Sequence, residues 1–193
     1  MLLAIDTSAG TSAAVLSDRL LSLVKFDDPF GHAEGIGNVI SQALTDAGVK
    51  ASEITAVAIG RGPAPYTGLR VGMAAGLAFA QARKIPVHGV MVLDAVAHSL
   101  NFPKLVLFSD AKRKEIFVAG FDNGVRTFGP EVMQPADLEG FADYEQIAAV
   151  CDAGLIGLYA LSQLSQGADL TDVSALYLRS PDVRPSPPKK VSG

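Results

Sequence analysis

Tryptophan is absent from the sequence, and cysteine occurs once, at Cys151. A single cysteine excludes an internal disulfide framework and fits a reducing compartment. Free cysteines are most often small apolar packing residues, so we favour that role for Cys151 over a nucleophilic one.

Long apolar runs and an excess of basic residues are also missing. No apolar stretch approaches the roughly 18 residues of a membrane span, and Asp6 comes too early for the apolar core of a signal peptide. The net charge is −4, so the protein as a whole would not attract a polyanion. We therefore expect a cytoplasmic protein with no membrane partner, which would meet nucleic acid only through a partner.

The composition that remains is that of a globular protein, with 49% apolar and 19% charged residues in 193. Three strand-like segments, Leu2–Asp6, Ser12–Ser17 and Leu20–Phe26, are joined by hairpin-sized turns. Helical and strand-like segments then alternate, which predicts the order β-β-β-α-β-α-β-α up to about Leu100. This order predicts a mixed sheet, antiparallel on one side and parallel where helices intervene.

The segment "NFPK" marks a junction, after which a second set of strands is expected. A short helix is predicted at Pro135–Phe141, and the signals weaken after Asp143, where a strand and a helix are one possibility. We predict a first lobe at 1–100, a smaller second lobe at 101–180 and a proline-rich flexible tail at 181–193.

The stretch "GRGPAPYTGLRVGMAAGLAFA" from Gly60 to Ala80 has the glycine content of a phosphate loop. A P-loop needs a lysine followed by a hydroxyl residue after its second glycine, and neither is found here. A dinucleotide fingerprint needs a third glycine where Pro65 stands. Both nucleotide-binding motifs therefore fail at residues on which their chemistry depends.

In the predicted helix, the small residues Gly68, Gly72, Gly76 and Ala80 recur every four positions and form one stripe. Each glycine costs about 1 kcal/mol relative to alanine inside a helix, so the stripe indicates a close neighbour. The neighbour is either this protein's own sheet or first helix, or a helix of another protein, and both alternatives stay open.

Asp6 ends the first strand, and "DTSAGTS" resembles the first phosphate loop of the actin-like ATPase and sugar-kinase superfamily. The second such loop would lie at Asp110, but its turn contains Lys112, Arg113 and Lys114 instead of glycines. We therefore treat Asp6, Thr7 and Ser8 as a vestigial phosphate loop, and we favour a structural role for Asp6 over a magnesium ligand.

The three histidines are scattered along the sequence at positions 32, 88 and 98. A helical metal site would need a second ligand four residues after His32, where Ile36 stands. We predict neither a metal site nor a catalytic residue.

Several segments together resemble the TsaB (YeaZ) family, a subunit of the bacterial machinery that makes threonylcarbamoyladenosine beside the tRNA anticodon. The matching segments are "LLAIDTS", "GHAEGIGNVISQAL", "AVAIGRGPAPYTGLRVGMAAGLAFA", "IPVHGVMVLDAVA", "DAKRKEIFVAGF" and "ALYLRSPDV". The block G-R-G-P-x-x-[FY]-T-G-L-R is the most specific of them.

The resemblance implies an α/β actin-like (ASKHA, ribonuclease H-like) fold of two lobes, each with a mixed sheet and flanking helices. It implies a scaffold without catalysis of its own, paired with a TsaD-type catalytic subunit and joined by a TsaE-type ATPase. Pairing would use the helices at Ala33–Ala47 and Thr67–Ala82. The interface residues that we assign are Ala33, Gly37, Ile40, Leu44, Gly68, Leu69, Gly72, Met73, Gly76 and Ala80.

The resemblance implies no cofactor for the chain alone, although ATP or ADP is compatible with the assembled complex. The chain departs from the family at Ala64, Pro65 and Tyr66, where Gly-Ser-Phe is usual, and in a short stretch between Gly140 and Thr171. Two alternatives stay open: an actin-like ATPase or small-molecule kinase that uses Asp6 and Thr7, and a homodimer formed through the same stripe when no partner is present.

Overall fold

The structure is a computed structural model, and it describes residues 1–26 and 32–178, without the side chains of residues 32–34. The predicted tail at 181–193 lies outside these residues, as do the side chains of His32 and Ala33. Within the described part, no helix is long and apolar enough to cross a membrane.

The first sheet has five strands in the order β3-β2-β1-β4-β5. The strands are β1 (Leu2–Asp6), β2 (Thr11–Leu16), β3 (Leu20–Phe26), β4 (Ala56–Gly60) and β5 (Val87–Val90). The β1–β2 and β2–β3 pairs are antiparallel, whereas β1–β4 and β4–β5 are parallel. The mixed sheet predicted from the sequence is confirmed, including the side on which it is antiparallel.

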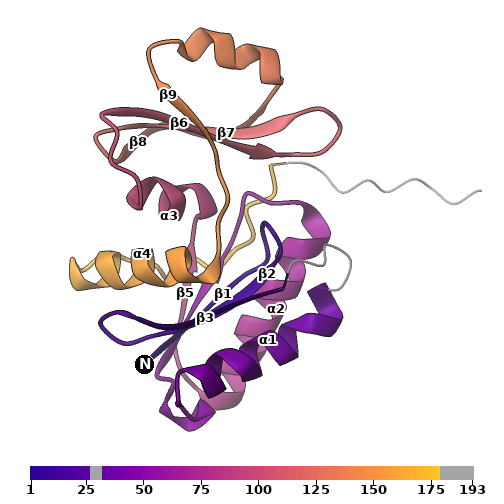
Figure 1. Cartoon of the computed structure of the whole chain (residues 1–193), viewed down its shortest axis with the longest axis vertical. Helices are drawn as coiled ribbons and strands as arrows, with labels where there is room; N and C mark the ends of the chain where they lie inside the picture. The colour runs from indigo at the N-terminus through magenta and orange to yellow at the C-terminus, as the bar shows by residue number, and fades with distance from the viewer. Residues whose placement is uncertain (27–31, 179–193) are drawn as a thin grey trace, which may run out of the picture.

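Helices cover both faces of this sheet. On one face lie α1 (His32–Asp46) and α2 (Tyr66–Arg83), with a 3₁₀ turn, η1 (Ala51–Glu53), between α1 and β4 (Figure 1). On the other face lies α4 (Ala153–Ser165), which contacts β1 and β2. Because both faces are covered, every residue of β1 and β2 is buried.

The second sheet has four strands in the order β8-β7-β6-β9. They are β6 (Lys104–Asp110), β7 (Ile116–Asp122), β8 (Val125–Met133) and β9 (Glu145–Ala148). One face packs against the 3₁₀ helix η2 (Pro135–Phe141), where Phe128 and Phe141 stack with ring centroids 4.8 Å apart. The strand and helix suggested after Asp143 are β9 and α4.

Two helices fill the space between the sheets. Figure 1 shows α3 (Val92–His98) and α4 lying between the second sheet and the first. A single apolar cluster runs from Leu2 and Leu16 of the first sheet, through Leu93 and Ile156, to Leu107 and Phe121 of the second. The two sheets therefore share one core, and the lobe boundary near residue 100 stays a prediction.

The last described segment returns to the first sheet. The Gly89 N–H donates to the Leu170 carbonyl (2.8 Å), and the Leu176 N–H donates to the Arg61 carbonyl (2.8 Å). The Arg61 side chain also forms an ion pair with Asp172, with 2.9 Å between Nη1 and Oδ2. Residues 170–176 thus run from β5, the edge strand of the first sheet, to Arg61, the residue that follows β4.

Candidate functional site

The loop after β1 contains the three residues predicted as a vestigial phosphate loop. Asp6 is only 2% exposed. Its Oδ2 accepts hydrogen bonds from the Ser8 N–H (3.1 Å) and the Ser8 hydroxyl (2.7 Å). Its Oδ1 has no hydrogen-bond partner among the described residues and faces Gly60, where an added Cβ would collide with it.

Burial dominates the electrostatics of this carboxyl group. It raises the pKa of Asp6 to about 6, against the lowering effect of the Ser8 hydrogen bonds, and the nearby charge of Asp152 adds to the rise. The carboxyl group of Asp6 is thus enclosed by protein rather than open to solvent.

Thr7 is engaged with helix α2. Its hydroxyl donates to the Gly68 carbonyl (2.7 Å) and accepts from the Gly72 N–H (3.2 Å), and the residue is 4% exposed. The loop residues that an actin-like ATPase would turn toward phosphate are therefore used here in contacts within the chain.

The glycine stripe of α2 faces the first sheet. A Cβ at Gly72 would meet Thr7, and a Cβ at Gly76 would meet Ile59 and, at 3.4 Å, Cγ1 of Val57. The close neighbour indicated by the stripe is thus the protein's own sheet, the first of the two alternatives left open by the sequence.

The predicted interface residues fall into two groups. Six of them lie on the buried side of α2, namely Gly68, Leu69, Gly72, Met73, Gly76 and Ala80. On α1, Gly37 is exposed with nothing within 4 Å of an added Cβ, whereas Ile40 and Leu44 are half-buried against the core. Ala33 lies outside the described side chains.

The exposed side of α2 was missed by the sequence analysis. It carries Arg70, Ala74, Leu77 and Ala78, while α1 exposes Asn38, Ser41 and Gln42. The signal was present in the helical period, because positions 70, 74 and 77 lie opposite the 68, 72 and 76 stripe. The interface was instead assigned to the glycine stripe, which lies on the buried side of the helix.

The turn after β6 brings the second predicted loop opposite the first. Lys112 donates to Asp110 from its N–H (2.7 Å) and its ammonium group (2.8 Å), which lowers the pKa of Asp110. Lys112, Arg113 and Lys114 have φ values of 65°, 56° and 62°, a left-handed conformation that favours glycine. The backbone thus takes a glycine-type path without glycine, at the cost of strain.

A small cavity of about 210 Å³ lies between these two loops, lined by Ser8, Ala9, Pro63, Ala64, Pro65, Ser109, Asp110 and Lys112. Two of its walls are the predicted loops, so the structure places them face to face, as the actin-like resemblance implies. The third wall is Pro63–Pro65, which includes two of the three residues that depart from the family pattern, Ala64 and Pro65.

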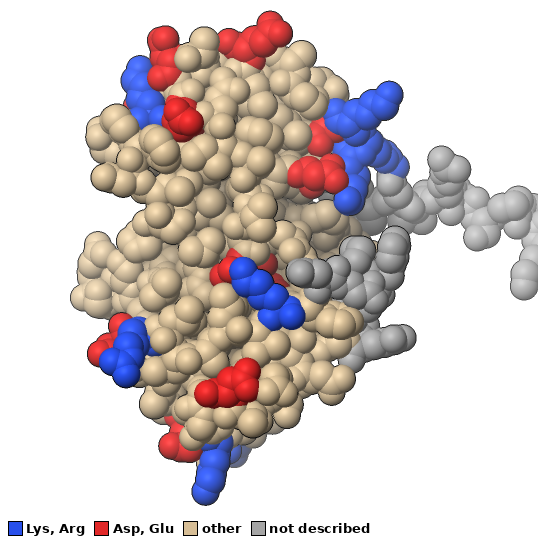
Figure 2. All heavy atoms as spheres, in the orientation of Figure 1, with Lys and Arg blue, Asp and Glu red and all other residues tan. Residues whose placement is uncertain are grey.

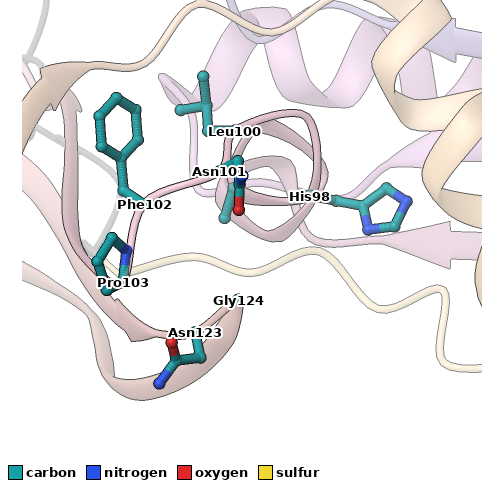
Figure 3. Close-up of a pocket in the computed structure, with 8 residues that line it drawn as sticks. His98, Leu100, Asn101, Phe102, Pro103, Asn123 and Gly124 are labelled. Atoms are coloured by element: carbon teal, nitrogen blue, oxygen red, sulfur yellow. The ribbon is translucent and has the colours of Figure 1, made fainter.

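The histidines take part in no metal-binding cluster within the described residues. His98 lines a cavity of about 430 Å³ at the end of α3 with Asn101 and Asn123, and its ring lies edge-on to Tyr159, with centroids 5.4 Å apart. Figure 3 shows His98 on the opposite side of this helix end from Phe102. His88 is partly buried, and burial lowers its pKa.

Cys151 is buried, and burial raises the pKa of its thiol well above the ordinary value. This environment suits the packing role expected from the sequence. The surface is sparsely charged, and in the view of Figure 2 acidic and basic side chains are scattered in small groups over a largely uncharged surface.

Comparison with known proteins places this geometry in a family. Residues 30–176 match the family model described as TsaD: tRNA N6-adenosine threonylcarbamoyltransferase. The uncharacterized protein Rv3421c of Mycobacterium tuberculosis is 34% identical over 203 aligned positions, which cover 95% of this chain and 93% of that protein. Mycobacterium leprae ML0378 is 37% identical over 170 positions, 82% of this chain and 47% of that protein.

The tRNA N6-adenosine threonylcarbamoyltransferase of Pelobacter propionicus is 33% identical over 153 positions, covering 67% of this chain and 45% of the enzyme. The chain thus spans about half the length of that enzyme and of ML0378.

Among solved structures, YeaZ from Pseudomonas aeruginosa superposes with a TM-score of 0.76 at 22% identity, over 92% of this chain and 99% of YeaZ. A second structure from the same organism, described as similar to peptidase YEAZ, gives a TM-score of 0.74. The predicted actin-like α/β fold is confirmed by this match. The chain therefore belongs to the family of tRNA N6-adenosine threonylcarbamoyltransferase (TsaD) proteins and has the fold of YeaZ, in agreement with the TsaB (YeaZ) resemblance of its sequence.

Proposed function

We propose that this chain is a non-catalytic scaffold subunit in the transfer of a threonylcarbamoyl group to the adenosine beside the tRNA anticodon. It pairs with a TsaD-type catalytic subunit and activates it. The observation that carries this proposal is the engagement of the loop after β1: Asp6 is buried against Gly60, and the Thr7 hydroxyl bonds to the backbone of α2. In an enzyme with this fold, those groups would be needed at the phosphate.

The proposed docking surface is the exposed side of α1 and α2. It consists of Gly37, Asn38, Ser41, Gln42, Arg70, Ala74, Leu77 and Ala78, and is called the docking surface below. These eight residues are uncharged except for Arg70, and half of them are small, which allows the backbone of a partner helix to come close. The buried stripe residues support this surface from beneath.

The other members of the assembly are proposed from the TsaB (YeaZ) resemblance of the sequence. A TsaE-type ATPase joins the pair, tRNA contacts this chain only through the complex, and ATP or ADP is held at the level of the complex. The cytoplasm is where these components would meet.

The first test is an omit-one reconstitution. TsaD, TsaE, threonylcarbamoyl-adenylate synthase, ATP, threonine, bicarbonate and tRNA are incubated with and without the chain, and modified adenosine is counted. We expect product only when the chain is present. Equal product without it would reject the scaffold proposal and favour the alternative of an ATPase or kinase that uses Asp6 and Thr7, which calorimetry with Mg-ATP on the isolated chain would then test.

A matched pair of substitutions tests the docking surface. Leu77 on α2 and Leu158 on α4 are 38% and 41% exposed, and their helices cover opposite faces of the first sheet. We expect Leu77→Glu to abolish pairing with the TsaD-type subunit, because it places an unpaired charge in the interface. Leu158→Glu should leave pairing intact. Equal affinities of the two variants would remove the docking surface from the interface.

Self-association through the same surface is the remaining alternative. Light scattering of the chain alone and with its partner distinguishes the two assemblies. A homodimer that persists unchanged in the presence of TsaD would contradict the heterodimer, whereas a dimer that gives way to the heterodimer would support a shared surface.

A further inference from the structure

We infer that Thr7 is the residue that positions helix α2, and through it the docking surface, by bonding its hydroxyl between the Gly68 carbonyl and the Gly72 N–H. The part of this inference that concerns α2 stands on the structure alone. The part that concerns the docking surface rests on the proposed function.

The two partners of Thr7 belong to a single step of the helix. In an α-helix, the N–H of residue 72 points toward the carbonyl of residue 68. The Thr7 hydroxyl donates to that carbonyl (2.7 Å) and accepts from that N–H (3.2 Å). A side chain that enters the ladder in this way is one of the identifiable causes of a local change in helix direction.

The sequence of α2 provides the space for this contact. A Cβ at Gly72 would lie 3.0 Å from Cγ2 and 3.2 Å from Cβ of Thr7, in addition to its collision with the hydroxyl oxygen. Thr7 is fully enclosed, at 4% exposure, so it has no room to retreat. The glycine at 72 is therefore explained by Thr7, whereas the glycine at 76 is explained by Ile59.

The same turn of α2 is held from its outer side. The Arg70 guanidinium lies 3.8 Å from the centroid of the Tyr66 ring and donates from Nε to the Tyr177 hydroxyl (2.9 Å). Thr7 on the inside and Tyr177 on the outside thus fix the beginning of a helix whose next turns carry Ala74 and Leu77. A shift of this turn would move the α2 part of the docking surface relative to the α1 part.

The chain offers a close control for the loss of a buried hydroxyl. Ser12 is 5% exposed, and its hydroxyl also makes one donated and one accepted hydrogen bond, to the Asp6 carbonyl (3.2 Å) and from the Ala153 N–H (2.9 Å). The bond from Ala153 leads to α4, on the opposite face of the sheet, whereas the bond to Asp6 stays within the β1–β2 pair. Ser12→Ala therefore removes an equivalent hydroxyl without touching α2.

The first measurement is amide hydrogen exchange on the isolated chain. Thr7→Val keeps the shape of the side chain and removes the hydroxyl, whereas Thr7→Ser keeps the hydroxyl. We expect exchange at Gly72 and its neighbours to become about 10-fold faster in Thr7→Val and to remain near wild type in Thr7→Ser. Ser12→Ala should accelerate exchange at Ala153 and leave Gly72 unchanged. Unchanged exchange at Gly72 in Thr7→Val would overturn the inference.

The second measurement is the affinity for the TsaD-type subunit by calorimetry. We expect Thr7→Val to bind about 10-fold more weakly, Thr7→Ser to restore binding, and Ser12→Ala to bind like wild type. Faster exchange at Gly72 with unchanged affinity for the TsaD-type subunit would show that Thr7 has only a structural role and would reject its positioning role. If Thr7→Val does not fold, the comparison of Thr7→Ser with Thr7→Ala provides the same test. The exchange measurement needs no partner, so its result stands even if the proposed function is wrong. Failure of the proposed function can therefore be distinguished from failure of this inference.

Discussion

At the scale of single residues, the most unusual group is the carboxyl of Asp6. It lies buried at the end of β1, with one oxygen bonded to Ser8 and the other without a partner among the described residues. The group is 2% exposed, and among the described residues Lys25 pairs with Asp152 rather than with Asp6. Burial therefore disfavours the ionised form of the Asp6 carboxyl group.

This environment predicts a dependence of stability on pH. The pKa of Asp6 is raised from 3.8 to about 6, so the folded state binds its proton more tightly than the unfolded state does. The corresponding stabilisation, about 3 kcal/mol, is fully present below pH 4 and is lost as the pH rises through 6. We expect Asp6→Asn to abolish this contribution, because the amide is never ionised and can still accept from Ser8.

Urea denaturation of both proteins between pH 4 and 7 measures the effect. The difference in free energy of unfolding between Asp6→Asn and wild type should grow in favour of the variant as the pH rises. Asp94, whose pKa is also raised by burial, contributes equally to both proteins and cancels. A difference that is constant with pH would contradict the assigned pKa.

Two glycines that the sequence pattern treats alike should respond to alanine in opposite ways. Gly72→Ala places a methyl group against Thr7, so we expect a loss of about 1–3 kcal/mol in the free energy of unfolding. At Gly37 nothing lies within 4 Å of an added Cβ, so Gly37→Ala should stabilise the helix by about 1 kcal/mol. Thermal unfolding followed by circular dichroism measures both. Equal effects at the two sites would show that α2 does not approach Thr7 as closely as described.

At the scale of elements, the beginning of α4 depends on parts of the chain far away in sequence. The Ala153 N–H donates to the Ser12 hydroxyl, and the Leu155 N–H donates to Oδ1 of Asp152, the N-cap residue. The other oxygen of Asp152 pairs with Lys25 of β3. One aspartate therefore both caps the helix and ties it to the edge of the first sheet.

These two roles of Asp152 can be separated. Asp152→Asn keeps an oxygen for the cap and loses only a partly exposed ion pair, so we expect a cost below about 1 kcal/mol. Asp152→Ala loses the cap as well, and should cost about 1–2 kcal/mol more. Chemical denaturation gives both values, and Lys25→Met, which removes the ion pair alone, should resemble Asp152→Asn. A Lys25→Met variant as unstable as Asp152→Ala would assign the stabilisation to the ion pair.

The elements also differ in how far the sequence predicts them. The strands from Leu2 to Phe26 and the helix around Gly72 were predicted, because their apolar periodicity and turn residues are local. The side on which α2 buries its glycines was left open, since a stripe of small residues has the same pattern whether it faces a sheet or a partner. The contacts of the Thr7 hydroxyl with α2 and of the Ser12 hydroxyl with Ala153 join residues 61 to 141 positions apart, and no local pattern encodes them.

At the scale of the whole molecule, the two sheets are joined by the apolar cluster around α3 and α4. Because that cluster contains residues of both sheets, we expect a single cooperative unfolding transition in calorimetry, with equal calorimetric and van't Hoff enthalpies. Two separate transitions would indicate lobes that unfold independently.

A fragment of residues 1–100 provides a direct test of this cooperativity. It contains all five strands of the first sheet but lacks α4, so Leu2, Leu16 and other apolar residues that α4 covers would face water. We expect this fragment to aggregate or to unfold without a cooperative transition, in contrast with the full chain. A cooperative transition in the fragment would establish the first lobe as an independent unit.

The return of α4 to the first sheet has a consequence for the biosynthesis of the protein. The strands of that sheet are complete at Val90, but the helix that covers their second face ends at Ser165. At translation rates of about 5–20 residues per second, the ribosome needs several more seconds to make that cover. During this interval the nascent chain carries an open apolar sheet face, which is the kind of surface that ribosome-associated chaperones bind. We therefore expect the first sheet to complete its folding only after α4 has been synthesised.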